Sequence, residues 1–91
     1  MKSDNSNEEY WKYYVSTLKI IAKEKDLNVE DIAAKSELIA STIKRIFDLK
    51  FEPPFEVFLK IADAVEAEVL YSEIDGQIEI HHIVPKRKPL E

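Results

Sequence analysis

The chain has 91 residues, with 13 Lys and Arg against 18 Asp and Glu, a formal net charge of −5 and no cysteine. This length allows one domain with a modest core, and the absence of cysteine excludes disulfides and thiolate metal sites. A single glycine excludes phosphate-binding loops of the P-loop and dinucleotide type. No apolar run has the length of a membrane span, and residues 1–7 are too polar for a signal peptide. We therefore expect a cytoplasmic protein without contact to a membrane.

The first predicted helix covers about residues 7–25 and follows a flexible leader over residues 1–7. Ser6 and Glu9 fit a capping box at its start. Apolar residues then recur at steps of three and four, which is typical of one buried helix face. They are Tyr10, Trp11, Tyr14, Val15, Leu18, Ile21 and Ala22. Aromatic residues at this spacing favour a core over a platform for stacking bases, and Tyr13, off the stripe, is a candidate interface residue.

Three shorter helices are predicted next, over about residues 29–35, 40–48 and from Pro53-Pro54 to 65. Asn28 is a good N-cap for the first of them. The second places Ile43, Ile46 and Phe47 inward. Proline is tolerated in a first turn, so the proline pair can start the third helix. Its apolar stripe consists of Phe55, Phe58, Leu59, Ala62 and Val65.

After Ala67 the apolar pattern changes from a helical period to alternation, which predicts a β-hairpin over residues 68–84. Asp75-Gly76 is a strong two-residue turn, since both central positions need positive φ. If the strands are paired outward from this turn, Glu73 lies opposite Ile78, Tyr71 opposite Ile80 and Val69 opposite His82. The resulting apolar face, formed by Val69, Tyr71, Ile78 and Ile80, needs cover. A fifth short helix over residues 68–72 is the alternative, and residues 85–91 form a basic flexible tail.

The segment 27–65 contains two helices that are too short to fold alone and a tight connection between them. Their shared core would consist of Ile32, Ala33, Leu38, Ile43 and Ile46, with Phe58 and Ala62 from the next helix. This is the spacing of a helix-turn-helix unit. The segment reads LNVEDIAAKSELIASTIKRIFDLKFEPPFEVFLKIADAV. Its clearest motif pieces are Ile32-Ala33, Ser41-Thr42-Ile43 with Arg45-Ile46, and Pro53 followed by FLKIADAV.

On these residues the chain resembles the Xre family of helix-turn-helix regulators, the Cro and phage-repressor type. The resemblance implies a compact helical domain, DNA binding through the helix at 40–48, dimerisation, and a role as repressor or antitoxin. Three single positions and one three-residue segment depart from the family pattern. Val29 replaces a glutamine that contacts phosphate, Glu37 replaces a turn glycine, Ile39 replaces a serine-like cap, and Phe47-Asp48-Leu49 replaces Glu-Arg-Gly.

Local charge supports a nucleic-acid contact in spite of the acidic total. Residues 35–50 carry four basic and two acidic side chains, a local charge of +2, and the tail adds Lys86, Arg87 and Lys88. Such asymmetry can produce a positive face for phosphates. We expect Ser41, Thr42 and Lys44 to reach base edges, and Arg45 and Lys50 to contact phosphate. Arg45 could instead pair with Asp48, three residues further along the helix.

Other chemistries have less support. His81 and His82 are adjacent in a predicted strand and should point to opposite faces, so we expect no metal site. The carboxylates lack a nucleophile or phosphate loop, and we expect neither an enzyme nor a cofactor.

The sequence thus predicts a mainly α, lambda-repressor-like helix-turn-helix domain of four helices, or five, over residues 8–67, with a C-terminal hairpin as the dimerisation element. We expect a sequence-specific repressor that binds double-stranded DNA as a homodimer. The alternatives are an antitoxin that binds both its operator and a toxin protein, and a protein-interaction module that retained the fold without DNA binding.

Overall fold

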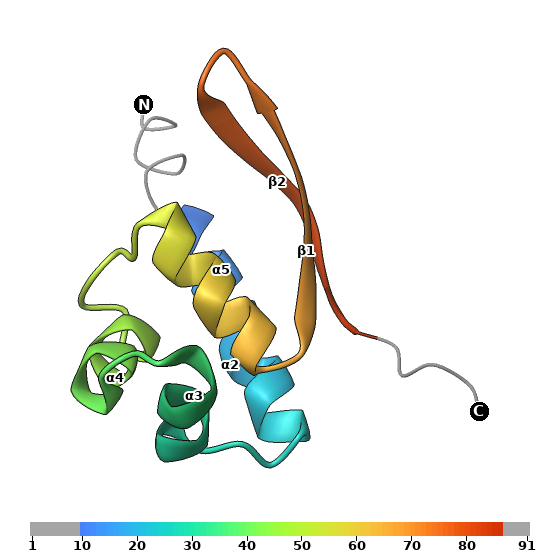
Figure 1. Cartoon of the computed structure of the whole chain (residues 1–91). Coiled ribbons are helices and arrows are strands. Elements are labelled where there is room, and N and C mark those ends of the chain that lie inside the picture. The colour runs from blue at the N-terminus through green and yellow to red at the C-terminus, as the bar shows by residue number, and fades with distance from the viewer. Residues whose placement is uncertain (1–9, 87–91) are drawn as a thin grey trace.

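The computed structural model describes residues 10–86, and Figure 1 shows the order of their elements. The helices are α2 (Tyr10–Glu24), α3 (Val29–Ser36), α4 (Ala40–Phe47) and α5 (Phe55–Ala64), and the strands are β1 (Ala67–Ile74) and β2 (Gln77–Pro85). No helix in this part of the chain is both long and apolar enough to span a membrane. The predicted leader, the Ser6–Glu9 capping box and residues 87–91 of the predicted tail lie outside the described residues.

The predicted helices and hairpin are present in the described part of the chain, but the mainly α class is wrong. Helices account for 53% of the described residues, and the two antiparallel strands add a sheet of substantial length, so the fold is mixed α/β. The fifth helix considered over residues 68–72 is also wrong, because that segment belongs to β1. Cross-strand hydrogen bonds satisfy backbone groups that a helix of five residues would leave unpaired at its ends.

Helix ends follow the local sequence. The side chain of Asn28 accepts a hydrogen bond from Asp31 N at 2.8 Å, and the carboxylate of Asp31 accepts one from Asn28 N at 3.1 Å, a reciprocal capping box. Ile39 caps α4 without any side-chain hydrogen bond. The last helix begins at Phe55 with Pro54 as its N-cap, so the proline pair precedes the first turn instead of forming it.

The core lies where α3 and α4 pack against α2 and α5. Its largest fully buried side chains are Leu18, Ile32, Ile43, Ile46, Ile61, Val15 and Val65. Five of the seven positions predicted to share this core are buried, namely Ile32, Ile43, Ile46, Phe58 and Ala62. Ala33 and Leu38 are half-buried and pack against the same cluster. The inner face of α4 is thereby held against the body of the domain.

The hairpin runs along α5 and continues past the N-terminal end of that helix (Figure 1). Val69, Ile80 and Ile83 are half-buried against the helical core, and the ring of Tyr71 meets that of Phe55 edge to face at 4.8 Å. The tip, with Ile74 at 64% exposure, has no such cover. Of the apolar face predicted to need a partner, Val69 and Ile80 are therefore covered by the chain's own helices, whereas Tyr71 and Ile78 remain 43% and 38% exposed.

The register agrees with the sequence prediction near the turn and departs from it further out. Glu73 pairs with Ile78 and Tyr71 with Ile80 as expected, but Val69 pairs with Ile83, so the predicted pairing with His82 is wrong. A β-bulge between Leu70 and Tyr71 adds one residue to β2. This extra residue lets Ile83 instead of His82 take the inward position opposite Val69.

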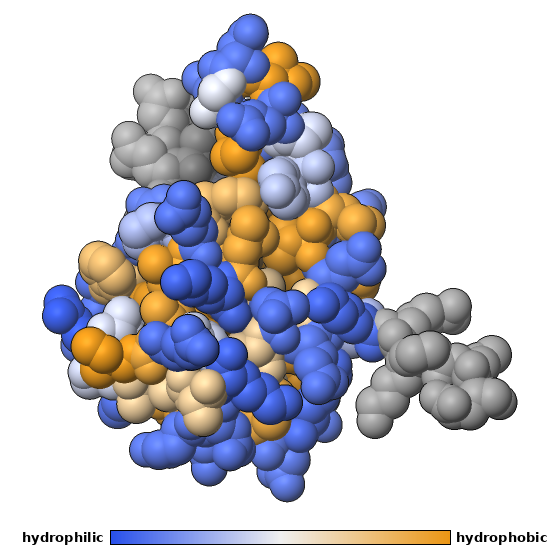
Figure 2. Space-filling view, viewed as in Figure 1, coloured by the Kyte–Doolittle hydropathy of each residue, from blue (hydrophilic) through white to orange (hydrophobic). Residues whose placement is uncertain are grey.

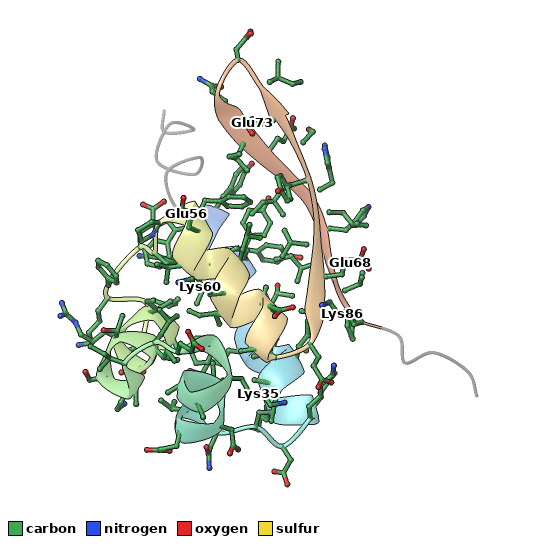
Figure 3. The ribbon with its side chains drawn as sticks, viewed as in Figure 1. Lys35, Glu56, Lys60, Glu68, Glu73 and Lys86 are labelled. Carbon is green, nitrogen blue, oxygen red and sulfur yellow. The ribbon has the colours of Figure 1, made fainter. Side chains whose placement is uncertain are left out.

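Lys25, in the turn after α2, and Lys35, on α3, anchor the start of the hairpin. Lys25 Nζ donates to the backbone oxygen of Glu66 at 2.9 Å and approaches its carboxylate at 3.4 Å, and Lys35 Nζ lies 3.6 Å from the other carboxylate oxygen. The hydrogen bond from Lys25 and the two positive charges lower the pKa of Glu66. Lys86 pairs with Asp63 at 2.9 Å, which raises the pKa of Lys86. Glu68 lies near this second pair at the base of the hairpin (Figure 3).

Five residues other than glycine adopt positive φ in the described segment, among them Glu37 at φ 63°. Glu37 follows α3, where a left-handed residue normally closes the helix, and its N–H donates to Ala33 O at 2.8 Å. A side chain strains this conformation, whereas glycine adopts it freely. The one glycine in the chain, Gly76, is already used in the hairpin turn.

Glu37→Gly should therefore raise the free energy of unfolding by about 0.5–1 kcal/mol, after allowing for the greater unfolded-state freedom of glycine. Urea denaturation followed by circular dichroism measures the change. Ala34→Gly, an exposed position within α3, is the matched control and should destabilise by about 0.5–1 kcal/mol. Equal destabilisation by both substitutions would contradict a strained turn at Glu37.

Candidate nucleic-acid interface

The outward face of α4 collects most of the predicted DNA-contacting residues. The opposite face of this helix is buried through Ile43, Ile46 and Phe47. Ser41, Lys44 and Arg45 are exposed, and Thr42 is half-buried. Because α4 is only eight residues long and its apolar side is fully engaged, this polar face is the surface it can offer to a ligand.

The basic side chains of α4 contact neighbouring side chains in a way that the sequence analysis did not predict. Lys44 Nζ lies 3.1 Å from Asp48 Oδ2, one helical turn away. The guanidinium of Arg45 lies 5.9 Å from the centre of the Phe51 ring. The pairing of Arg45 with Asp48 considered above is therefore wrong, because Lys44 holds that carboxylate. Arg45 and Lys44 consequently point to different parts of the surface.

Lys50 lies beyond the end of α4. Leu49 adopts positive φ, and the N–H of Lys50 donates to Arg45 O at 3.0 Å, which closes the helix and turns the chain. The side chain of Lys50 is exposed and forms no ion pair with another described residue. It extends the basic surface past the helix end, where a phosphate group could approach.

A shallow cleft separates the N-terminal ends of α3 and α4. It has a volume of about 440 Å³ and is lined by Asn28, Val29, Glu30, Ala40, Ser41 and Lys44. Ser41 and Lys44 thus share one depression with Val29. Beside it, the side chain of Ile39 is 69% exposed. The surface is consequently a mixture of hydroxyl, ammonium, carboxylate and aliphatic groups.

The local positive charge is smaller than the sequence count suggests. Lys35, one of the four basic residues in segment 35–50, lies 3.6 Å from Glu66. Reasoning along the sequence missed this pair, because 31 positions separate its members and no periodic pattern joins them. Phe51 was missed for a different reason: an aromatic residue after a helix end looks like part of the core, yet this one is 40% exposed and faces Arg45.

The two adjacent histidines, His81 and His82, lie on the hairpin, away from this surface. His81 Nε2 lies 2.9 Å from the hydroxyl of Ser72, and His82 pairs with Leu70 across the strands. Because Ser72 and Leu70 belong to the same face of β1, both histidines lie on the outer face, so the expectation that they point to opposite faces is wrong. Over residues 10–86, no group of three or more histidine, cysteine or acidic side chains could hold a metal ion.

In comparisons with known proteins, no protein-family model, no curated protein and no solved structure matches this chain.

Proposed function

We propose that the protein is a cytoplasmic regulator that binds double-stranded DNA in a sequence-specific manner and acts as a repressor. The observation that carries the proposal is the orientation of α4, which buries Ile43 and Ile46 and turns Ser41 and Lys44 outward. A short, firmly packed helix with a polar outer face has the dimensions to enter a major groove. The resemblance of segment 27–65 to the Xre family supports the same role.

Two kinds of contact are assigned to the site. Ser41, Thr42 and Lys44 are proposed to read base edges, where hydroxyl and ammonium groups find acceptors in the major groove. Arg45 and Lys50 are proposed to contact phosphates on either side of the groove. The Lys44–Asp48 pair does not prevent this role, since a salt bridge between exposed groups contributes only about 0.2–1 kcal/mol and can be exchanged for a base contact.

The direct test is a selection from a pool of randomised duplexes at low and moderate salt. We expect enrichment of a defined sequence and an affinity that falls with salt, with a slope of about −0.9 per neutralised phosphate in a plot of log affinity against log salt. A double-stranded poly(dA)·poly(dT) competitor measures non-specific binding. Failure to enrich any duplex at either salt concentration would contradict sequence-specific DNA binding.

A homodimer is the proposed assembly. Both edges of the two-stranded sheet are unpaired in the described structure, and Leu70, Ile74, Ile78 and Val84 expose between 38% and 64% of their surface. Unprotected strand edges with apolar side chains favour pairing with another chain. A two-fold dimer through the hairpins would present two copies of α4, and a spacing of about 34 Å between them would match successive major grooves.

Sedimentation equilibrium over a wide concentration range tests the homodimer. Leu70→Lys places a charge on this surface and should weaken the dimer at least about tenfold. Ile20→Lys, at a position of 58% exposure on α2, is the matched control and should leave the association unchanged. A monomeric mass at every concentration would contradict the homodimer.

The second candidate is a protein-interaction module, with an antitoxin that binds both operator and toxin as the intermediate case. The exposed side chain of Ile39 favours it, because an aliphatic group at 69% exposure beside Val29 and Ala40 suits a protein partner better than DNA. The duplex selection separates the candidates: an interaction module enriches no sequence, whereas an antitoxin enriches its operator.

A further inference from the structure

An open cleft with aromatic walls lies on the side of the domain where the hairpin leaves the helices. It has a volume of about 610 Å³, within the range of small-molecule sites. Figure 2 shows apolar residues gathered between the hairpin and the N-terminal half of α5, in contrast to the hydrophilic surface over α3. The aromatic residues that line the cleft are Tyr10, Trp11, Tyr14, Phe55 and Phe58.

The aromatic walls are held in place by contacts on both sides. Phe58 is buried, and its ring stacks with that of Phe55 at 6.3 Å between centroids. The hydroxyl of Tyr14 donates to Ile80 O at 3.3 Å, which ties α2 to β2 across the cleft. The ring of Tyr10 meets that of Tyr14 edge to face at 6.5 Å. Two helices and the hairpin thus contribute to one lining.

The charged residues lining the cleft are both acidic. Glu52 precedes α5 and Glu79 lies on β2, and neither forms an ion pair with another described residue. The face of an aromatic ring carries negative electrostatic potential and attracts cations. The ring of Trp11 already has one such contact, with Lys12 Nζ 5.8 Å from its centroid. Away from the Lys12 ammonium, the aromatic faces and the carboxylates of Glu52 and Glu79 therefore give the cleft a negative character.

We propose that this cleft binds a small organic cation with an alkylated ammonium head. The methyl groups of such a head would lie against the aromatic rings, and its charge would be balanced by Glu52 and Glu79. Glu79 belongs to β2 and Glu52 to the segment before α5, whereas the rings belong to α2 and α5, so the ligand would bridge the hairpin and the helices. The site is separate from α4, and its existence does not depend on DNA binding.

The 91-residue chain contains its own reporter for the test, because Trp11 is its only tryptophan. Choline is the probe, and 3,3-dimethyl-1-butanol is the neutral molecule of the same shape. Titration of each at constant ionic strength, followed by tryptophan fluorescence, should give saturable binding that is about tenfold tighter for choline. Choline should also raise the unfolding temperature, since it binds the folded state.

The double variant Glu52→Gln, Glu79→Gln keeps the shape of the cleft and removes its charges. It should lose about tenfold in affinity for choline and none for the alcohol. Glu30→Gln, Glu68→Gln changes the net charge equally at exposed positions outside the cleft and should bind choline as the parent does. Circular dichroism verifies that each variant is folded. Equal affinities for choline and the alcohol, no saturable fluorescence change with choline, or equal losses in both double variants would overturn the proposal.

Discussion

Ile43→Ala should lower the free energy of unfolding by about 2–5 kcal/mol, a large part of the stability that a domain of this size possesses. The side chain of Ile43 has 0% exposure and lies on the inner face of α4. Its truncation removes three carbon atoms from contact with the core, and the surrounding helices can collapse only partly into the cavity. Urea denaturation, with circular dichroism as the readout, measures the loss.

The matched control for this substitution is Ile39→Ala, four residues earlier at the N-cap of the same helix. Ile39 is 69% exposed and contributes no side-chain hydrogen bond to the cap, so we expect a change within about 0.5 kcal/mol. Similar losses for the two variants would mean that Ile43 does not hold α4 to the core. The orientation of the proposed recognition helix would then lack its main support.

Lys44→Ala and Lys50→Ala should weaken DNA binding in two distinguishable ways. Loss of a base contact from Lys44 should cost about 1–3 kcal/mol for the selected duplex and change the preference among sequences. Lys50 is proposed to contact phosphate, so its removal should weaken binding to all duplexes similarly. It should also reduce the slope of log affinity against log salt by about one unit. Fluorescence anisotropy with the selected duplex and a scrambled one measures both effects.

Two further variants control this comparison. Lys60→Ala removes the same charge from α5 (Figure 3), outside the proposed interface, and should have little effect. Asp48→Asn removes the carboxylate that pairs with Lys44 and should strengthen binding to every duplex, because it also removes a negative charge facing phosphates. If Lys44→Ala and Lys60→Ala behave alike on the selected duplex, α4 is not the reading helix.

The helices could be predicted from the sequence because their signals are local. Asn28 with Asp31 marks the start of α3, and the inward positions Ile43 and Ile46 follow from a helical period. Asp75-Gly76 likewise predicts the turn, since both residues adopt the positive φ that the turn needs. Each of these signals lies within a few residues of the structure that it specifies.

The overall class was harder to predict from the same signals. The bounds of the hairpin agree with the prediction to within one residue, but it was expected as an appendage to a mainly α domain. The strands instead pack onto the helical core through Val69, Ile80 and Ile83. Such cover is a tertiary property, which a pattern within the strand does not contain.

The sequence by itself determined where the helices and the turn lie and which face of α4 is apolar. Three features were decided only by the tertiary structure. A bulge places Ile83 instead of His82 opposite Val69, Lys35 pairs with Glu66, and Trp11 and Glu79 line the same cleft. The physical reason is distance along the chain. Periodicity and turn chemistry act between neighbouring residues, whereas these contacts form only after packing has brought distant segments together.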